Sequence, residues 1–148
     1  MSKNKETKNE TLAPLSLTVT LRDIVDSVQS LQEITSQKTS ATLSFTLGIV
    51  LRTINPFLQE YAKQRNTLRD ELYTKKEDGK SLEPKVENAD KLFSDQVDAM
   101  LDGPVTLVGI GRIRMSLLAD EGIKLDGQDA AALYWLLKND MQSLFDTD

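Results

Sequence analysis

The longest pattern of apolar positions in the chain runs from Ser40 to Tyr73. Apolar residues recur there every three, four or seven positions, at Leu43, Leu47, Val50, Ile54, Phe57, Tyr61, Leu68 and Leu72. This spacing places them in one stripe along an α-helix, interrupted by Arg65. Pro56 removes a backbone donor, so we expect a kink there or two helices that meet at Asn55. A helix with one long apolar stripe cannot bury it alone, so other elements or another copy must cover it.

Two segments outside this stretch have the same helical spacing. Residues 21–34 form the first, and Thr20 with Asp23 three positions later is typical of a capped helix start. Residues 127–145 form the second, and Asp126 is the predicted cap. Both should pack as flanking helices on the long one.

A charged turn separates the long helix from one further helical segment. Residues 75–84 read KKEDGKSLEP, centred on the turn-forming pair Asp78-Gly79. Residues 86–101 again have helical spacing, so the chain should fold back as an αα-hairpin. The turn also resembles part of a calcium loop, but Thr74 and Lys76 stand where that loop needs carboxylates. We therefore exclude calcium binding there.

Two short stretches favour β structure. Residues 15–20 alternate apolar and polar, and residues 104–117 are rich in β-favouring side chains, with Gly109 and Gly111 indicating a bulge or two short strands. We expect these stretches to pair in one sheet. The predicted fold class is therefore α+β and predominantly helical, a long-helix αα-hairpin with flanking helices and a small antiparallel β-sheet.

The length of 148 residues suits one domain. We expect residues 1–13 to be a flexible polar arm, because they have no apolar periodicity, and residues 14–148 to form a single α+β domain. No run of about 18 apolar residues and no signal-peptide pattern is present, so we expect a soluble cytoplasmic protein with no membrane partner.

The composition limits the chemistry. The chain has no histidine and no cysteine, so it lacks the commonest general base, the commonest metal ligand and every thiol. We therefore predict that the protein is not an enzyme and uses no cofactor and no metal. Asp95, Asp98 and Asp102 fall near one helix face and could hold magnesium, but a solvated charged face explains them better.

The net charge of −5 makes direct nucleic-acid binding unexpected, because a nucleic-acid groove needs clustered Lys and Arg. The charge is compatible with binding a basic protein face, with mimicking nucleic acid, or simply with solubility. Gly109-Ile110-Gly111 looks like the start of a dinucleotide fingerprint, but Arg114 replaces the third glycine. A bulge or close packing is the better interpretation.

Three groups of residues are candidates for a protein interface. Arg112 and Arg114 are expected on the same face of a predicted strand. There they could bind a phosphate or carboxylate partner, or instead pair with the acids Asp120 and Glu121. One of Tyr134 and Trp135 should face inward, and the other is a possible interface anchor.

The third group lies in the first half of the long helix. Between Ala41 and Ile54 the apolar positions also include Phe45, Ile49 and Leu51, so they are wider than one face. We expect this segment to contact another copy of the chain or a different subunit.

Several runs together resemble a family of small uncharacterised proteins of tailed bacteriophages. The long helix has the family's aromatic-x-x-x-Arg-x-x-Leu pattern at Tyr61, Arg65 and Leu68. The runs that carry the resemblance are LQEYAKQRNTLRDEL (58–72), KKEDGK (75–80), FSDQVDAML (93–101), VTLVGIGRI (105–113) and AALYWLL (131–137). The resemblance implies a phage origin and supplies no activity.

These observations lead to two predicted functions. The first is a non-enzymatic virion structural or assembly component at the head, neck or tail, present as a homo-oligomer or as a member of an assembly with other phage subunits. The second is a phage-encoded acidic inhibitor that binds a host protein, such as a nucleic-acid enzyme or a defence factor. The expected location is the host cytoplasm, the virion, or both.

Overall fold

The computed structural model describes residues 15–141. In this part of the chain 57% of the residues lie in five helices, which confirms the predominantly helical α+β class. In chain order the elements are β1 (Ser16–Thr20), α2 (Leu21–Thr35), α3 (Ala41–Leu72), β2 (Tyr73–Lys75), β3 (Leu82–Pro84), α4 (Ala89–Leu101), β4 (Pro104–Val108), β5 (Ile113–Arg114), α5 (Met115–Asp120), α6 (Gly127–Ala132) and β6 (Leu137–Lys138). The predicted arm and the last part of the predicted final helix lie outside the described residues.

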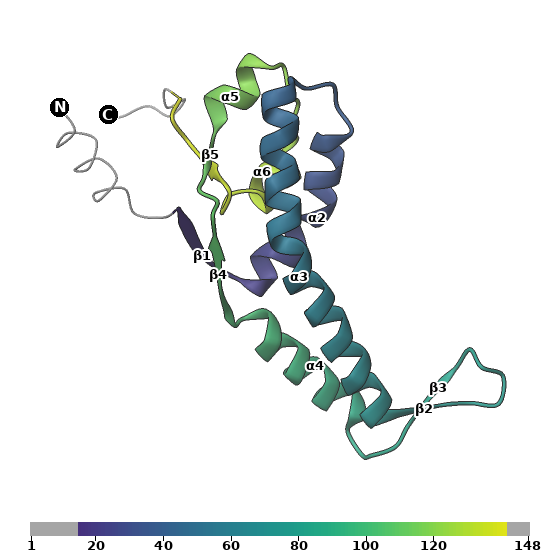
Figure 1. Ribbon diagram of the computed structural model, residues 1–148. Coiled ribbons are helices and arrows are strands. Elements are labelled where there is room, and N and C mark those ends of the chain that lie inside the picture. The colour runs from purple at the N-terminus through teal and green to yellow at the C-terminus, as the bar shows by residue number, and fades with distance from the viewer. Residues whose placement is uncertain (1–14, 142–148) are drawn as a thin grey trace, which may run out of the picture.

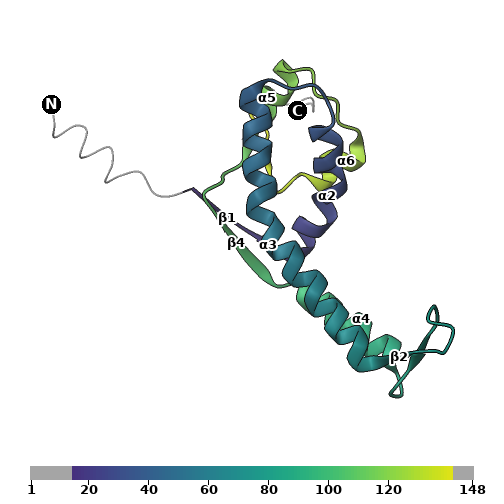
Figure 2. The same ribbon diagram turned by 45° about the vertical axis from the view of Figure 1, so that its right-hand side comes forward.

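The helix α3 runs the length of the molecule. It begins where the Ser40 hydroxyl accepts a hydrogen bond from the Leu43 amide at 3.1 Å, as the sequence indicates. The helix is continuous over 32 residues, so the expectation of two helices meeting at Asn55 is wrong. Pro56 lies at its middle, and its axis changes direction partway along in both views (Figures 1 and 2). The bend agrees with the lost backbone donor.

The main core lies around the first half of α3. It joins the buried faces of α2, α3 and the β1–β4 pair to the segment after α6; its fully buried apolar side chains include Ile24, Leu31, Leu43, Ile54, Leu107 and Leu133. The start of α2 is held as predicted. The Thr20 hydroxyl accepts from the Asp23 amide at 3.1 Å, and the Asp23 carboxylate accepts from the Thr20 amide at 3.2 Å.

A second, smaller core lies between α4 and the second half of α3, which extend away from the rest of the molecule (Figure 1). This confirms the αα-hairpin. Leu68, Leu72 and Ala89 are its buried residues. Arg65, which interrupts the apolar stripe, lies over the ring of Phe93 with its guanidinium carbon 5.6 Å from the ring centroid. The interruption is therefore a cation–π contact between the two helices.

The turn that connects α3 to α4 is longer and more regular than predicted. β2 and β3 pair antiparallel as a hairpin, and α4 begins at Ala89, after the exposed Val86. Asp78 closes the hairpin by accepting from the amides of Lys80 at 2.8 Å and Ser81 at 2.9 Å. The hydrogen bonds from Ser81 and Lys80 lower the pKa of the Asp78 carboxyl.

The predicted sheet is confirmed for one pair of strands and wrong for the rest. β1 and β4 pair antiparallel with Leu17 opposite Leu107 and Val19 opposite Val105. Beyond β4 the chain does not continue along β1, because Gly109 has a φ of +93° and turns the backbone away. β5 pairs parallel with β6, and residues from Met115 onward form α5 rather than a strand.

The predicted final helix is much shorter in the structure. α6 starts at the predicted cap, where the Asp126 carboxylate accepts from the Asp129 amide at 2.7 Å, but it ends at Ala132. The next residues explain this, because Leu133 and residues 135–137 are all buried. A helix covered on one side cannot bury nearly every consecutive residue, so the chain leaves the helix and becomes irregular.

A small polar cluster joins α2 to α6. Asp129 is only 9% exposed, and its carboxylate accepts a hydrogen bond from the Ser30 hydroxyl at 2.8 Å. This bond lowers the pKa of Asp129 despite the opposing effect of burial. Glu33, one turn further along α2, has its pKa raised, chiefly by Asp129. The folded state therefore holds two neighbouring carboxyls with opposite shifts.

We expect Glu33→Gln to raise the melting temperature at about pH 7 and to leave it nearly unchanged at about pH 3. Because the pKa of Glu33 is raised in the folded state, ionising Glu33 destabilises the fold above that pKa. The penalty disappears as the carboxyl is protonated on acidification. Thermal unfolding across this pH range checks the result. Glu87→Gln removes an exposed charge elsewhere; an equal gain there would assign the effect to the net charge instead.

Candidate protein interface

The first half of α3 has apolar side chains on two faces. Leu43, Leu47 and Val50 face the core, whereas Phe45 is 72% exposed and Ile49 is 38% exposed. Phe45 and Ile49 are four positions apart in the helix, so their side chains share a face of it. Leu51, also expected to widen the stripe, packs against the core instead. The structure therefore places Phe45 and Ile49 together at the surface.

Ile49 also lines a groove between α3 and the segment from Gly109 to Arg114. The groove encloses about 350 Å³, and we call it the α3 groove. Its apolar lining side chains are Leu15, Ile49, Val50, Ile110, Ile113 and Leu117. Gly111 permits a close approach here, because a β-carbon on it would lie 3.3 Å from a methyl carbon of Leu15. The glycines of the apparent fingerprint thus serve a turn and close packing.

Arg112 and Arg114 also line the α3 groove, and both side chains are exposed. Among the residues that the structure describes, no ion pair includes either of them. They do not pair with the acids that follow, because Glu121 instead accepts hydrogen bonds from the amide and hydroxyl of Ser40. Arg114 lies near Asp140 and helps to lower its pKa, after the larger effect of hydrogen bonds from Ser116.

Tyr134 and Trp135 divide as expected, one outward and one inward. Tyr134 is 76% exposed, and Trp135 is 7% exposed and belongs to the main core. Both line a second groove of about 560 Å³ beside β1, which we call the β1 groove, and Arg112 lines it as well. Tyr134 is thus the surface residue of the pair, and Arg112 lies between the two grooves.

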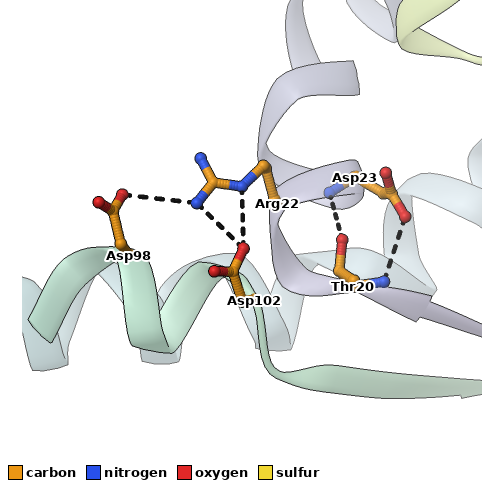
Figure 3. Close-up of polar contacts among 5 residues, drawn as sticks. All are labelled: Thr20, Arg22, Asp23, Asp98 and Asp102. Atoms are coloured by element: carbon orange, nitrogen blue, oxygen red, sulfur yellow. Dashed lines mark hydrogen bonds and ion pairs between the residues drawn. The ribbon is translucent and has the colours of Figure 1, made fainter. Parts of the chain in front are cut away.

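The predicted acidic face of α4 has a structural role at two of its three positions. Asp98 and Asp102 flank Arg22 of α2, with nitrogen–oxygen distances of 3.4 and 3.1 Å (Figure 3). Asp95 forms no ion pair in the part of the chain that the structure describes. Asp102 is the main cause of the raised pKa of Arg22. The side chains are well exposed, so this contact contributes little stability. Within residues 15–141 no cluster of three metal-binding side chains occurs.

By length and composition alone, the helix α3 could cross a membrane. Among the described residues this helix alone is long and apolar enough to cross a membrane, and 22% of its most apolar stretch is buried. The sequence predicted no such segment. In this fold the apolar stretch borders the main core on one face and the α3 groove on the other.

The resemblance to tailed-phage proteins stays a prediction, and so do the partner and location that it implies. Comparisons with protein-family models, with curated proteins and with solved structures found no match.

Proposed function

We propose that this protein acts by binding another protein, as a non-enzymatic structural or assembly component of a phage particle. The observation that carries the proposal is the α3 groove, where the exposed Ile49 lies beside Arg112 and Arg114, together with the exposed Phe45 on the same face of α3. Burying an exposed side chain of the size of Phe45 contributes about 1.5–3 kcal/mol to association. Arg112 and Arg114, which form no ion pair within residues 15–141, add selectivity for a partner that presents carboxylates.

The remaining chemistry supports a binding role. The carboxylates with lowered pKa values have structural partners, such as Ser30 for Asp129 and Ser116 for Asp140. A catalytic carboxylate would instead be expected in a cleft beside a substrate-sized space. Most side chains that line the two grooves are apolar; the α3 groove adds Arg112 and Arg114, and the β1 groove adds Asp23 and Arg112, which suits recognition of a polypeptide.

Mass spectrometry of purified phage particles that carry this gene tests the proposal. A fixed copy number relative to the main structural proteins is the expected result. Its absence from particles would contradict a structural role.

The acidic inhibitor of a host protein is the second candidate. The net charge of −5 favours it, because an acidic surface is complementary to a basic face of a nucleic-acid enzyme. A pull-down from infected cells separates the two functions. Recovery with phage structural proteins supports assembly, and recovery of one host protein in equal amount, lost at high salt, supports inhibition.

A further inference from the structure

Among the residues that the structure describes, the outer edge of β1 has backbone groups without partners. In this part of the chain β1 and β4 form a sheet of two strands. At its two ends, the Leu15 carbonyl accepts from the Gly109 amide at 2.8 Å, and the Leu21 amide donates to the Gly103 carbonyl at 3.0 Å. Hydrogen bonding alternates along an antiparallel strand, so the backbone amides and carbonyls of Leu17 and Val19 also point toward β4. The amides and carbonyls of the intervening residues point the other way.

Those intervening residues are Ser16, Thr18 and Thr20. The Thr20 amide is bound by the Asp23 carboxylate in the helix cap. Within residues 15–141 the backbone groups of Ser16 and Thr18 form no hydrogen bond. An edge of this kind is a template for a further strand, and a native chain usually covers or blocks it. Neither strand residue is a proline or a charged residue that would block it.

The β1 groove lies along this edge. Three consecutive residues of β1, Leu17 to Val19, line it, and no residue of β4 does, so it lies on the side of β1 away from β4. The opposite wall is formed by Tyr134 and Trp135. A volume of about 560 Å³ is enough for several side chains of an extended peptide.

The two ends of the β1 groove differ in charge. Asp23 lines the end beside the start of α2. Arg112 lines the other end, because Gly111 packs on Leu15 ahead of β1. Arg112 has no ion pair among the described residues. Trp135 lines the groove, and its Nε1 atom is a buried donor with no hydrogen-bond partner within residues 15–141. Such donors are rare in native structures.

We propose that the β1 groove binds an extended segment of another protein, which pairs antiparallel with β1 as a third strand. The added strand supplies partners for Ser16 and Thr18 and brings carbonyl groups to the wall that contains Trp135. Alternate apolar side chains of the segment pack against Tyr134 and Trp135. An acidic residue near its C-terminal end lies against Arg112. This site goes beyond the proposed function, because it uses the sheet edge and not the apolar face of α3.

The substitution Thr18→Pro tests strand addition directly. It removes the outward amide of Thr18 and leaves the hydrogen bonds between β1 and β4 in place, since proline is tolerated where the amide faces away from the sheet. Thr18→Val is the matched control, because it keeps the amide and removes only the hydroxyl that contacts Thr106. If Thr18→Pro proves unstable in thermal unfolding, Ser16→Pro removes the other outward amide nearer the start of the strand.

The probe is a random library of peptides of about ten residues, selected on the full-length wild-type chain. The fluorescence of Trp135 reports binding, because it is the only tryptophan of the chain. Selected peptides should carry an acidic residue toward their C-terminal end. They should bind Thr18→Pro at least about tenfold more weakly and Thr18→Val about as well as wild type. No enrichment, or equal binding to both variants, would overturn the proposal.

Amide hydrogen exchange measured by NMR gives a second readout. A bound peptide should slow exchange at Ser16 and Thr18 and leave Leu17 and Val19 unchanged, because the latter amides already face β4. If exchange at Ser16 and Thr18 instead slows as the protein concentration rises, without any peptide, a second copy of the chain occupies the edge. That result would reject binding of a different protein there. Phe45→Asp should not change peptide binding, so failure at one site is distinguishable from failure at the other.

Discussion

Replacing Ile54 by alanine should lower the free energy of unfolding by about 2–5 kcal/mol. Ile54 is fully buried in the main core near the middle of α3. The substitution removes three carbon atoms from the main core, and the surrounding side chains can close the space only partly. Urea denaturation followed by circular dichroism measures the loss.

Ile49→Ala is the matched comparison on the same helix. Ile49 is 38% exposed, so the same loss of atoms should cost less than about 1 kcal/mol. Both substitutions change helix propensity equally, and the difference between them reports burial alone. Equal losses at the two positions would contradict the assignment of Ile54 to the core face and of Ile49 to the α3 groove.

Phe45→Asp should weaken association about tenfold or more without unfolding the chain. The ring is 72% exposed in the isolated protein, so its contribution appears only when a partner covers it. Losing about 1.5–3 kcal/mol of apolar burial corresponds to at least a tenfold weaker complex. Incorporation into particles measures binding to other subunits, and analytical ultracentrifugation measures self-association. Helix content and the unfolding midpoint should stay as in the wild type.

Phe45→Ser separates apolar burial from charge. It removes the ring and adds no carboxylate, so it should produce most of the loss seen with Phe45→Asp. An effect confined to Phe45→Asp would instead indicate repulsion from an acidic partner. If the wild-type chain stays monomeric at high concentration and both variants are incorporated normally, this face is not an interface. If the wild-type chain stays monomeric and Phe45→Asp unfolds it, Phe45 belongs to the core instead.

The elements that sequence predicted well are those whose signals are local. α2 is defined by its apolar spacing and by the Thr20–Asp23 cap, and α3 by a stripe long enough to outweigh Pro56. β1 alternates polar and apolar residues over five positions, which fixes its buried face, and β4 consists mostly of β-favouring residues. Each of these features depends on residues within a few positions of one another.

The elements that sequence missed depend on distant contacts. α6 has a proper start at Asp126, but its end depends on the burial of Trp135 and its neighbours against α2 and the sheet. β5 is only two residues long and exists because the Ile113 amide meets the Leu136 carbonyl, which is far along the chain. No periodicity encodes a pairing this short.

The candidate interface shows the same division. The sequence identified Phe45, Ile49, Arg112 and Tyr134 one at a time, by exposure or charge expected from their spacing. It did not predict that Ile49 and Arg112 meet across the α3 groove, or that Tyr134 and Arg112 border the β1 groove. Those meetings follow from the turn at Gly109 and the early end of α6, which sequence patterns did not reveal.

The second core has a mechanical consequence. It contains three buried residues, and the continuous helix α3 joins it to the main core. Its other connections to the main core include an exposed ion pair of Arg22 and the hydrogen bond between the Leu21 amide and the Gly103 carbonyl. α4 should therefore separate from α3 at a lower free energy than the main core unfolds. A force applied at the β2–β3 hairpin would peel α4 away first. The contact between α4 and α3 is therefore expected to open first under load, while the main core and both grooves stay folded.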